Sequence, residues 1–254
     1  HANVVALEAM RPLHDPAYYQ FKSALEQIGR VRRVTIRFGK YSSRYDDILA
    51  HRHTNIFDCN MASGGLMDMG VYSVEPMVDL LGVPEAIAFA PILIDAQAED
   101  ITHGPIDAAG NIMCTYPGAV ATLHYSKFTQ DFSPVQIEGE RGTITLDSIS
   151  MPSHMRIDMM GVAVRMAART CASSGSTEEI DLPKTDNSMC YELADFIDAV
   201  EQAQAGTPPF EATCGAHGTV AHFRDLTLAT MDVMDQARAQ AGIAFPADRA
   251  GAQA

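Results

Sequence analysis

The sequence contains no tryptophan, few other aromatic residues and few basic ones. It holds 18 Lys and Arg against 32 Asp and Glu, so the 254-residue chain carries a formal net charge of −14 at pH 7. Nucleic acids and anionic membrane surfaces both attract basic proteins, and the acidic balance therefore argues against either partner. No stretch approaches the ~18 unbroken apolar residues of a membrane-spanning helix.

Cysteine is also sparse. The five cysteines are scattered, odd in number and free of C-x-x-C spacing. This pattern favours small buried thiols in a reducing compartment over a disulfide framework. The N-terminus has no charged segment ahead of a long apolar run, so it does not resemble a signal peptide. We expect a cytoplasmic protein.

Two glycine motifs of catalytic sites are missing. No G-x-G-x-x-G follows a strand and precedes a helix, so the loop that cradles a dinucleotide is absent and cofactor-binding residues stay unknown. No G-x-S-x-G is present either, which leaves serine-nucleophile chemistry without support. We expect the chain by itself to bind no NAD or NADP.

The order of the predicted elements indicates an α+β fold. At this length and with 47% hydrophobic residues, the chain can bury a sizeable core. Adjacent strands with short turns predict an open, mainly antiparallel sheet with helices on one face. We expect the other face to form the interface of a homodimer. The predicted segments are strands at Asn3–Glu8, Arg30–Tyr41, Ile87–Ile94, Ile112–Tyr116, Ala119–Lys127, Pro134–Gly139 and Thr143–Leu146, a long loop at Tyr41–Met61, and helices at Ala17–Ile28, Ser63–Gly82, Ser188–Ala205 and Cys214–Ala241.

Two of these segments carry more specific predictions. Along Arg30–Tyr41, apolar residues alternate with Arg32, Arg33 and Arg37, which predicts one apolar and one basic face. The basic face could pair with acidic neighbours, which is the common case, or could contact an anionic substrate. In Ser188–Ala205, helical spacing predicts that the apolar side chains are buried.

The helix predicted at Ser63–Gly82 is the best candidate for the chemistry. Ser63 and two glycines lead into it, apolar residues recur at helical spacing, and Gly82 is placed to end it. Asp68 and Tyr72 are four residues apart and should share one face. A carboxylate beside a phenol next to a glycine opening is a plausible acid/base pair. The alternative is a helix-start Asp and a half-buried core Tyr.

This stretch also carries a family resemblance. Gly64–Tyr72 resembles the glycine-rich helix start, G-G-x-L-x-D-x-G-x-[HY], of the glucose–fructose oxidoreductase/inositol dehydrogenase/MocA-type oxidoreductases. Glu8–Pro12, Tyr41–Tyr45 and Asn55–Phe57 follow the order and approximate spacing of the branch that is similar to dihydrodiol dehydrogenases. The resemblance extends to the C-terminal helices.

The resemblance implies an architecture and an activity. Residues 1–10 would hold the last strand of a dinucleotide-binding domain that the chain otherwise lacks, and residues 11–254 would form the substrate-binding and dimerisation domain. The full-length enzyme would use NAD or NADP to interconvert a secondary alcohol and a ketone on a sugar, cyclitol or cyclic diol. Tyr72 would transfer the proton and Asp68 would orient the reacting carbinol. An unperturbed tyrosine has a pKa of about 10, and relatives assist this group with a lysine of an E-K-P motif that is missing here.

Further residues would contact the small-molecule substrate. Arg11 follows the first predicted strand, Arg44, Asn55 and Phe57 lie in the long loop, and Tyr125 lies on an alternating strand. A module that binds a sugar-like ligand without catalysis remains the alternative function.

The same long loop contains residues of metal-ligand type. His51, His53, Asp58 and Cys59 are suitable for zinc, but two histidines two apart in a loop lack the constraint of a helical pair. We predict no metal here, and a metal-dependent hydrolase remains the lesser alternative.

Overall fold

The computed structural model describes residues 4–161 and 175–251. The chain divides into two compact units, residues 1–34 with 134–229 (unit 1) and residues 35–133 with 230–254 (unit 2). Strand β1 (Val31–Gly39) and helix α7 (Val220–Ala241) each contribute to both units. No helix of the described ranges is both long and apolar enough to cross a membrane.

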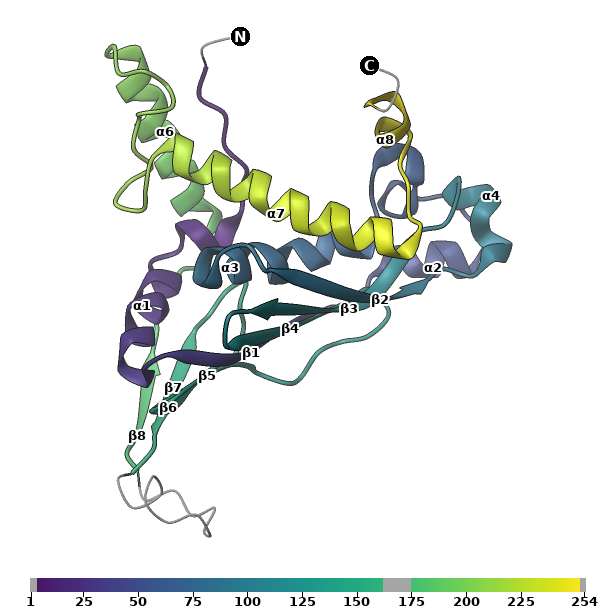
Figure 1. Cartoon of the computed structure of the whole chain (residues 1–254). Helices are drawn as coiled ribbons and strands as arrows, with labels where there is room; N and C mark the ends of the chain where they lie inside the picture. Colours follow the sequence, from purple (N-terminus) through teal and green to yellow (C-terminus); the bar gives the residue numbers. More distant parts are fainter. Residues whose placement is uncertain (1–3, 162–174, 252–254) are drawn as a thin grey trace. The chain divides into compact units, whose positions relative to one another are not determined.

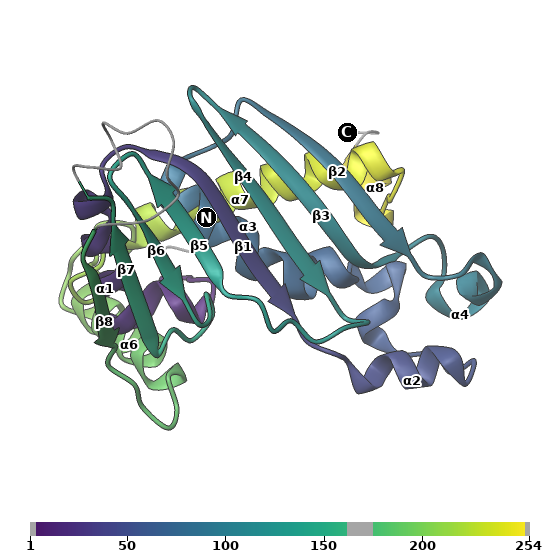
Figure 2. The same cartoon turned by 90° about the horizontal axis from the view of Figure 1, so that it is seen from below.

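Unit 2 contains a sheet with helices on one face. Its strand order is β2-β3-β4-β1, and β2–β3 and β3–β4 are antiparallel. Figure 1 shows α3 and the C-terminal part of α7 on one face of β2–β4, and Figure 2 shows the opposite face without a helix in the described part of the chain. The strands are β2 (Ala86–Leu93), β3 (Asp107–Tyr116) and β4 (Ala119–Ser126).

The helical segments of unit 2 surround a buried cluster that includes Phe57, Ile106, Ala108 and Phe245. The α-helices are α2 (Ser43–Leu49), α3 (Val71–Leu81), α4 (Glu99–Thr102) and α8 (Pro246–Gly251). The shorter turns are the 3₁₀ helices η3 (Asn55–Phe57), η4 (Cys59–Met61) and η6 (Ala96–Ala98), and the π-helical turn η5 (Leu66–Gly70).

Unit 1 contains the strand order β1-β5-β6-β7-β8, antiparallel from β5 to β8. The 3₁₀ helix η2 packs against β6, and α6 packs against η1. The strands are β5 (Val135–Gly139), β6 (Gly142–Leu146), β7 (His154–Met159) and β8 (Thr177–Asp181). The helices are η1 (Arg11–His14), α1 (Pro16–Ala24), η2 (Leu25–Ile28) and α6 (Met189–Gln204).

These elements confirm the predicted α+β class with its mainly antiparallel sheet. Ionic pairing accounts for the basic face of β1, because Arg32, Arg33 and Arg37 contact Glu140, Glu138 and Asp131. Most strand and helix bounds agree with the predicted ones within a few residues, since alternation and helical spacing are local properties of the chain.

Three local predictions were wrong. Residues 4–10 form no strand, because a strand needs a hydrogen-bonded neighbour and no described strand pairs with them; residues 1–3 lie outside the described ranges. The loop at Tyr41–Met61 contains α2, whose N-terminus the Ser42 hydroxyl caps. The apolar stripe of α6 is exposed, with Leu193 57% and Ile197 45% accessible, because no described segment covers it.

Candidate active site

The predicted glycine-led helix exists, and it begins with an irregular turn. Backbone hydrogen bonding is π-helical over η5 and becomes α-helical in α3. Gly82 ends the helix with φ 78°, as predicted. A π turn inside a helix is rare and often marks a functional site. Here it carries Asp68, and the first turn of α3 carries Tyr72.

The two glycines let the loop pass against a buried carboxylate. A Cβ atom on Gly65 would lie 2.6 Å from the backbone carbon of Ala108 and 2.7 Å from Oδ2 of Asp107. Gly64 adopts φ 124°, a conformation that other residues rarely adopt. The glycines therefore serve close packing at this point and do not line an open loop.

Asp107 fixes the start of the helix. Its Oδ2 accepts the backbone N–H of Leu66 at 2.6 Å and the hydroxyl of Tyr125 at 2.8 Å. Burial raises the pKa of Asp107 to about 6 against the lowering effect of these hydrogen bonds and of Lys127. Burial together with the charge of Asp107 also raises the pKa of Tyr125. Sequence reasoning missed Asp107, which stands outside the strand predicted for this region.

Lys127 holds Asp68. The ammonium group of Lys127 pairs with Oδ2 of Asp68 and lies 5.8 Å from the ring centroid of Phe57. The lysine side chain is 4% exposed, whereas that of Asp68 is 42% exposed. A buried cation thus supports a carboxylate that solvent or a ligand can reach. The backbone N–H of Lys127 donates to Ala108 at 2.8 Å, which fixes the lysine beside β3.

Sequence reasoning also missed Lys127, although a signal was present. In β4 the inward positions are Ala121, Leu123 and Tyr125, and Lys127 continues the same alternation. A lysine in the inward phase of a strand is unusual, because a buried ammonium group needs a partner. The inward position of Lys127 in the alternation of β4 therefore predicts that a carboxylate faces its ammonium group.

Tyr72 is half-buried, and its ring packs on Phe38 of β1. The two ring centroids are 4.7 Å apart and the planes are tilted by 33°. The partial exposure of Tyr72 fits both an acid/base group and a half-buried core tyrosine. Its role in proton transfer therefore stays a prediction.

The other predicted substrate residues occupy different environments. Phe57 and Tyr125 are buried, and their observed contacts are with Lys127 and Asp107. Arg44 is exposed and lies 3.8 Å from Asp47, and Asn55 is exposed in η3. Arg11 is half-buried in η1 of unit 1. Of the predicted residues, Asp68 and Phe57 both contact Lys127. Tyr125, two residues before Lys127 in the sequence, contacts Asp107.

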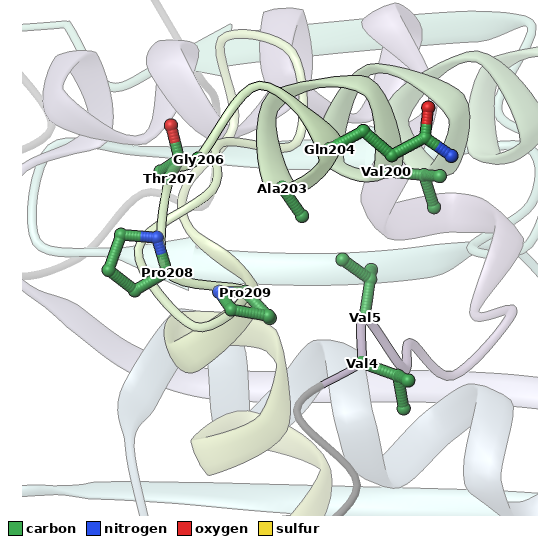
Figure 3. A pocket seen from close by; sticks show the side chains of 9 residues that line it. All are labelled: Val4, Val5, Val200, Ala203, Gln204, Gly206, Thr207, Pro208 and Pro209. Carbon is green, nitrogen blue, oxygen red and sulfur yellow. The ribbon is translucent and has the colours of Figure 1, made fainter.

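An open pocket in unit 1 contains little chemistry. Figure 3 shows it between the N-terminal segment and the end of α6, and only Gln204 and Thr207 among its lining residues have polar side chains. None of these residues is titratable, so we place the candidate site elsewhere. The lining residues are Val4, Val5, Val200, Ala203, Gln204, Gly206, Thr207, Pro208 and Pro209.

The residues of metal-ligand type make contacts that differ from the cluster considered in the sequence. His51 pairs with Asp100 at 3.0 Å, while His53 and His103 both contact the carboxylate of Asp58. His103, which sequence reasoning did not consider, therefore takes the place that His51 held in the predicted cluster.

Comparison with known proteins supports the resemblance. Residues 21–145 match the family model of the GFO/IDH/MocA C-terminal domain. The chain is 32% identical over 249 residues to scyllo-inositol 2-dehydrogenase (NADP(+)) IolU of Bacillus subtilis strain 168, covering 97% of this chain and 65% of IolU. It is 25% identical over 247 residues to the uncharacterized oxidoreductase YgjR of Escherichia coli strain K12, covering 96% and 64%. The chain therefore spans just under two thirds of each relative.

Solved structures share the fold at lower identity. KijD10, a 3-ketoreductase from Actinomadura kijaniata in complex with NADP and TDP-benzene, aligns with a TM-score of 0.67 and 18% identity over 94% of this chain and 63% of KijD10. UDP-N-acetylglucosamine 3-dehydrogenase GnnA from Acidithiobacillus ferrooxidans aligns with a TM-score of 0.60 and 16% identity over 93% and 63%. Residues 21–145 form a GFO/IDH/MocA C-terminal domain.

Proposed function

We propose that this chain is the substrate-binding, catalytic and dimerisation part of an NAD(P)-dependent oxidoreductase. The enzyme interconverts a secondary alcohol and a ketone on a sugar, cyclitol or cyclic diol. In this proposal residues 1–10 are the remnant of the dinucleotide-binding domain, and residues 11–254 form the substrate-binding and dimerisation domain. The names of IolU, which is NADP-dependent, and of KijD10 support this class of activity. We place the protein in the cytoplasm, because its described cysteines are unpaired.

The observation that carries the proposal is the ion pair between buried Lys127 and exposed Asp68. A buried ammonium group costs free energy of desolvation, and a surface carboxylate gains little stability from it. The pair is better explained by holding one carboxylate in a fixed orientation. With Oδ2 on Lys127, the other oxygen of Asp68 is left to accept the hydroxyl of the substrate carbinol.

Tyr72 then exchanges the proton of that carbinol. As the alcohol is oxidised, the phenolate form of Tyr72 accepts this proton and becomes the neutral phenol, and the phenol donates the proton when the ketone is reduced. Arg11, Arg44 and Asn55 remain proposed substrate contacts. Phe57 and Tyr125 are buried, so we propose that they act on the substrate only through Lys127 and Asp107.

The loop at Gly64 and Gly65 does not fit the phosphates of a bound dinucleotide. A phosphate cradle needs backbone N–H groups and free space at its glycines, but the space beside Gly64 and Gly65 is filled by Asp107. A buried carboxylate at that point would repel a pyrophosphate. We propose that residues outside this chain hold the cofactor.

Tyr72→Phe in the full-length enzyme tests the proposal. We expect kcat to fall by about 10² to 10⁴, the range of a lost general acid/base, while substrate binding measured by calorimetry is retained. Tyr191→Phe on α6 is the matched control and should leave kcat unchanged. Unaltered turnover of Tyr72→Phe would discard the assignment and favour a module that binds its ligand without catalysis.

A further inference from the structure

A second cluster of titratable side chains lies at the outer edge of unit 2. Nε2 of His53 lies 2.9 Å from Oδ2 of Asp58, and Nδ1 of His103 lies 2.8 Å from Oδ1 of the same carboxylate. The three ligand-type atoms lie within 4.8 Å of one another. His53 precedes η3, Asp58 lies between η3 and η4, and His103 ends α4, so two distant segments of the chain meet at one carboxylate.

We propose that His53, Asp58 and His103 form a binding site for a divalent transition-metal ion, with Zn²⁺ as the best match. Two imidazoles and one carboxylate are a common set of three protein ligands for zinc, and they leave a fourth position for water. The site is separate from Asp68 and Tyr72, and the proposal does not depend on the proposed function.

The carboxylate is held rigidly. Asp58 stands between the buried residues Phe57 and Cys59, and its side chain is only 7% exposed. The backbone N–H of Asn60 donates to Oδ1 at 2.9 Å, and the hydroxyl of Ser63 accepts the backbone N–H of Asp58 at 2.9 Å. A ligand fixed by its surroundings costs little conformational entropy when it binds an ion.

The two histidines are free to complete the coordination. Their side chains are 50% and 43% exposed, so each ring can rotate at its solvent side. Two nitrogens on one tetrahedral zinc lie about 3.3 Å apart, given Zn–N bonds of about 2.0–2.1 Å. Contraction from the present separations therefore requires about an ångström of ring movement and no shift of the backbone. Each nitrogen that now contacts Asp58 would give up its proton and carry the metal, while the opposite ring nitrogen, facing solvent, keeps one.

The backbone conformation of His103 and the carboxylate of Asp58 favour a metal site at this cluster. His103 adopts φ 58°, a left-handed conformation that costs free energy for residues other than Gly, Asn and Asp. That conformation aims its ring at Asp58. Asp58 supplies the acidic group of the cluster, and His53, His103 and the backbone N–H of Asn60 all contact its carboxylate.

A metal at this position would act as a structural clip. It would tie the segment around His53 to the turn at His103, and through Asp58 it would restrain Ser63, which leads into the glycine pair. A metal ion that binds the folded chain but not the unfolded chain raises the apparent free energy of unfolding. Zinc would therefore stabilise the loop from which the π turn with Asp68 begins.

Titration of the metal-free 254-residue chain, produced without a histidine tag, with ZnCl₂ tests the site. We expect one zinc per chain by calorimetry, a rise in Tm with zinc, and visible absorption of bound Co²⁺ when cobalt replaces zinc. His53→Gln and His103→Asn should each weaken zinc affinity at least about tenfold. Asn tolerates the left-handed backbone, so His103→Asn removes the imidazole without new strain.

His51→Gln is the matched control. His51 lies in the same loop and is similarly exposed, but it pairs with Asp100, outside the cluster. Its replacement should leave zinc affinity unchanged. Absence of stoichiometric zinc binding would show that the cluster is a set of ion pairs only. Equal loss of affinity in His51→Gln and His53→Gln would show non-specific binding by surface histidines, and either result overturns the proposal.

Discussion

At the scale of single residues, two buried charges on the inward side of the sheet organise the candidate site. Asp107 fixes the backbone at Leu66, at the start of the glycine-led helix, and Lys127 fixes the carboxylate of Asp68 two residues later. Both charges are costly to bury, and both are paired within unit 2. Each residue leads to a testable prediction.

Lys127→Met should separate stability from activity. Methionine fills a similar volume without an ammonium group, and Asp68 is exposed enough to be hydrated when its partner is lost. We expect Tm of the chain to stay the same or rise, and kcat of the full-length enzyme to fall by about 10²-fold. Steady-state kinetics and thermal unfolding check this, with the exposed Lys40→Met as control. Unchanged kcat would remove Lys127 from the site.

Asp107 predicts a pH dependence of stability. The folded chain binds one more proton than the unfolded chain between pH 3.8, the usual pKa, and about 6. Its free energy of unfolding therefore falls as pH rises through this range, by about 3 kcal/mol for this residue.

Asp107→Asn removes that proton uptake. Its side-chain oxygen can still accept the hydrogen bonds of Leu66 and Tyr125. Urea unfolding at pH 4.5 and pH 7 should show that the variant gains stability relative to the unmodified chain as pH rises. Asp198→Asn, at an exposed position of α6, is the control. Parallel pH profiles for the unmodified chain and Asp107→Asn would contradict the prediction.

At the scale of elements, close packing constrains the start of the glycine-led helix. Gly65→Ala would place a methyl group against the backbone of Ala108, which cannot move without displacing β3. We expect a loss of about 1–3 kcal/mol in free energy of unfolding. Gly82→Asn is the control, because it meets no atom within 4 Å and Asn tolerates its positive φ. A loss in the control as large as in Gly65→Ala would count against close packing as the cause.

Helix α6 illustrates the limit of pattern reasoning at the same scale. Its spacing predicted both the helix and its apolar stripe, and the helix is present. The stripe is nevertheless exposed, while Asp195 and Ala199 are buried. Amphipathic spacing identifies an apolar face, but it contains no information on which segment covers that face.

At the scale of the whole molecule, we propose that the helix-free face of β2–β4 forms a homodimer interface. Met113 and Ile92 are 50% and 58% exposed on this face, beside alanines of β2. Met113→Asp should shift the chain from dimer to monomer in analytical ultracentrifugation, since a carboxylate would be desolvated in the interface. Leu49→Asp, at an exposed position of α2, is the control. A monomeric unmodified chain, or a dimeric Met113→Asp, would refute the proposal.

The sequence by itself determined what is local: most strand and helix bounds, the left-handed end at Gly82, the α+β class and the resemblance to the GFO/IDH/MocA C-terminal domain. These follow from periodicity, turn residues and motif spacing, which act over a few neighbouring residues. Tertiary structure alone decided the contact between Asp68 and Lys127, 59 positions apart, and the meeting of Asp58 with His103, 45 positions apart. Such contacts depend on the pairing of β3 with β4 and on how loops pack over them, and no local pattern encodes that packing.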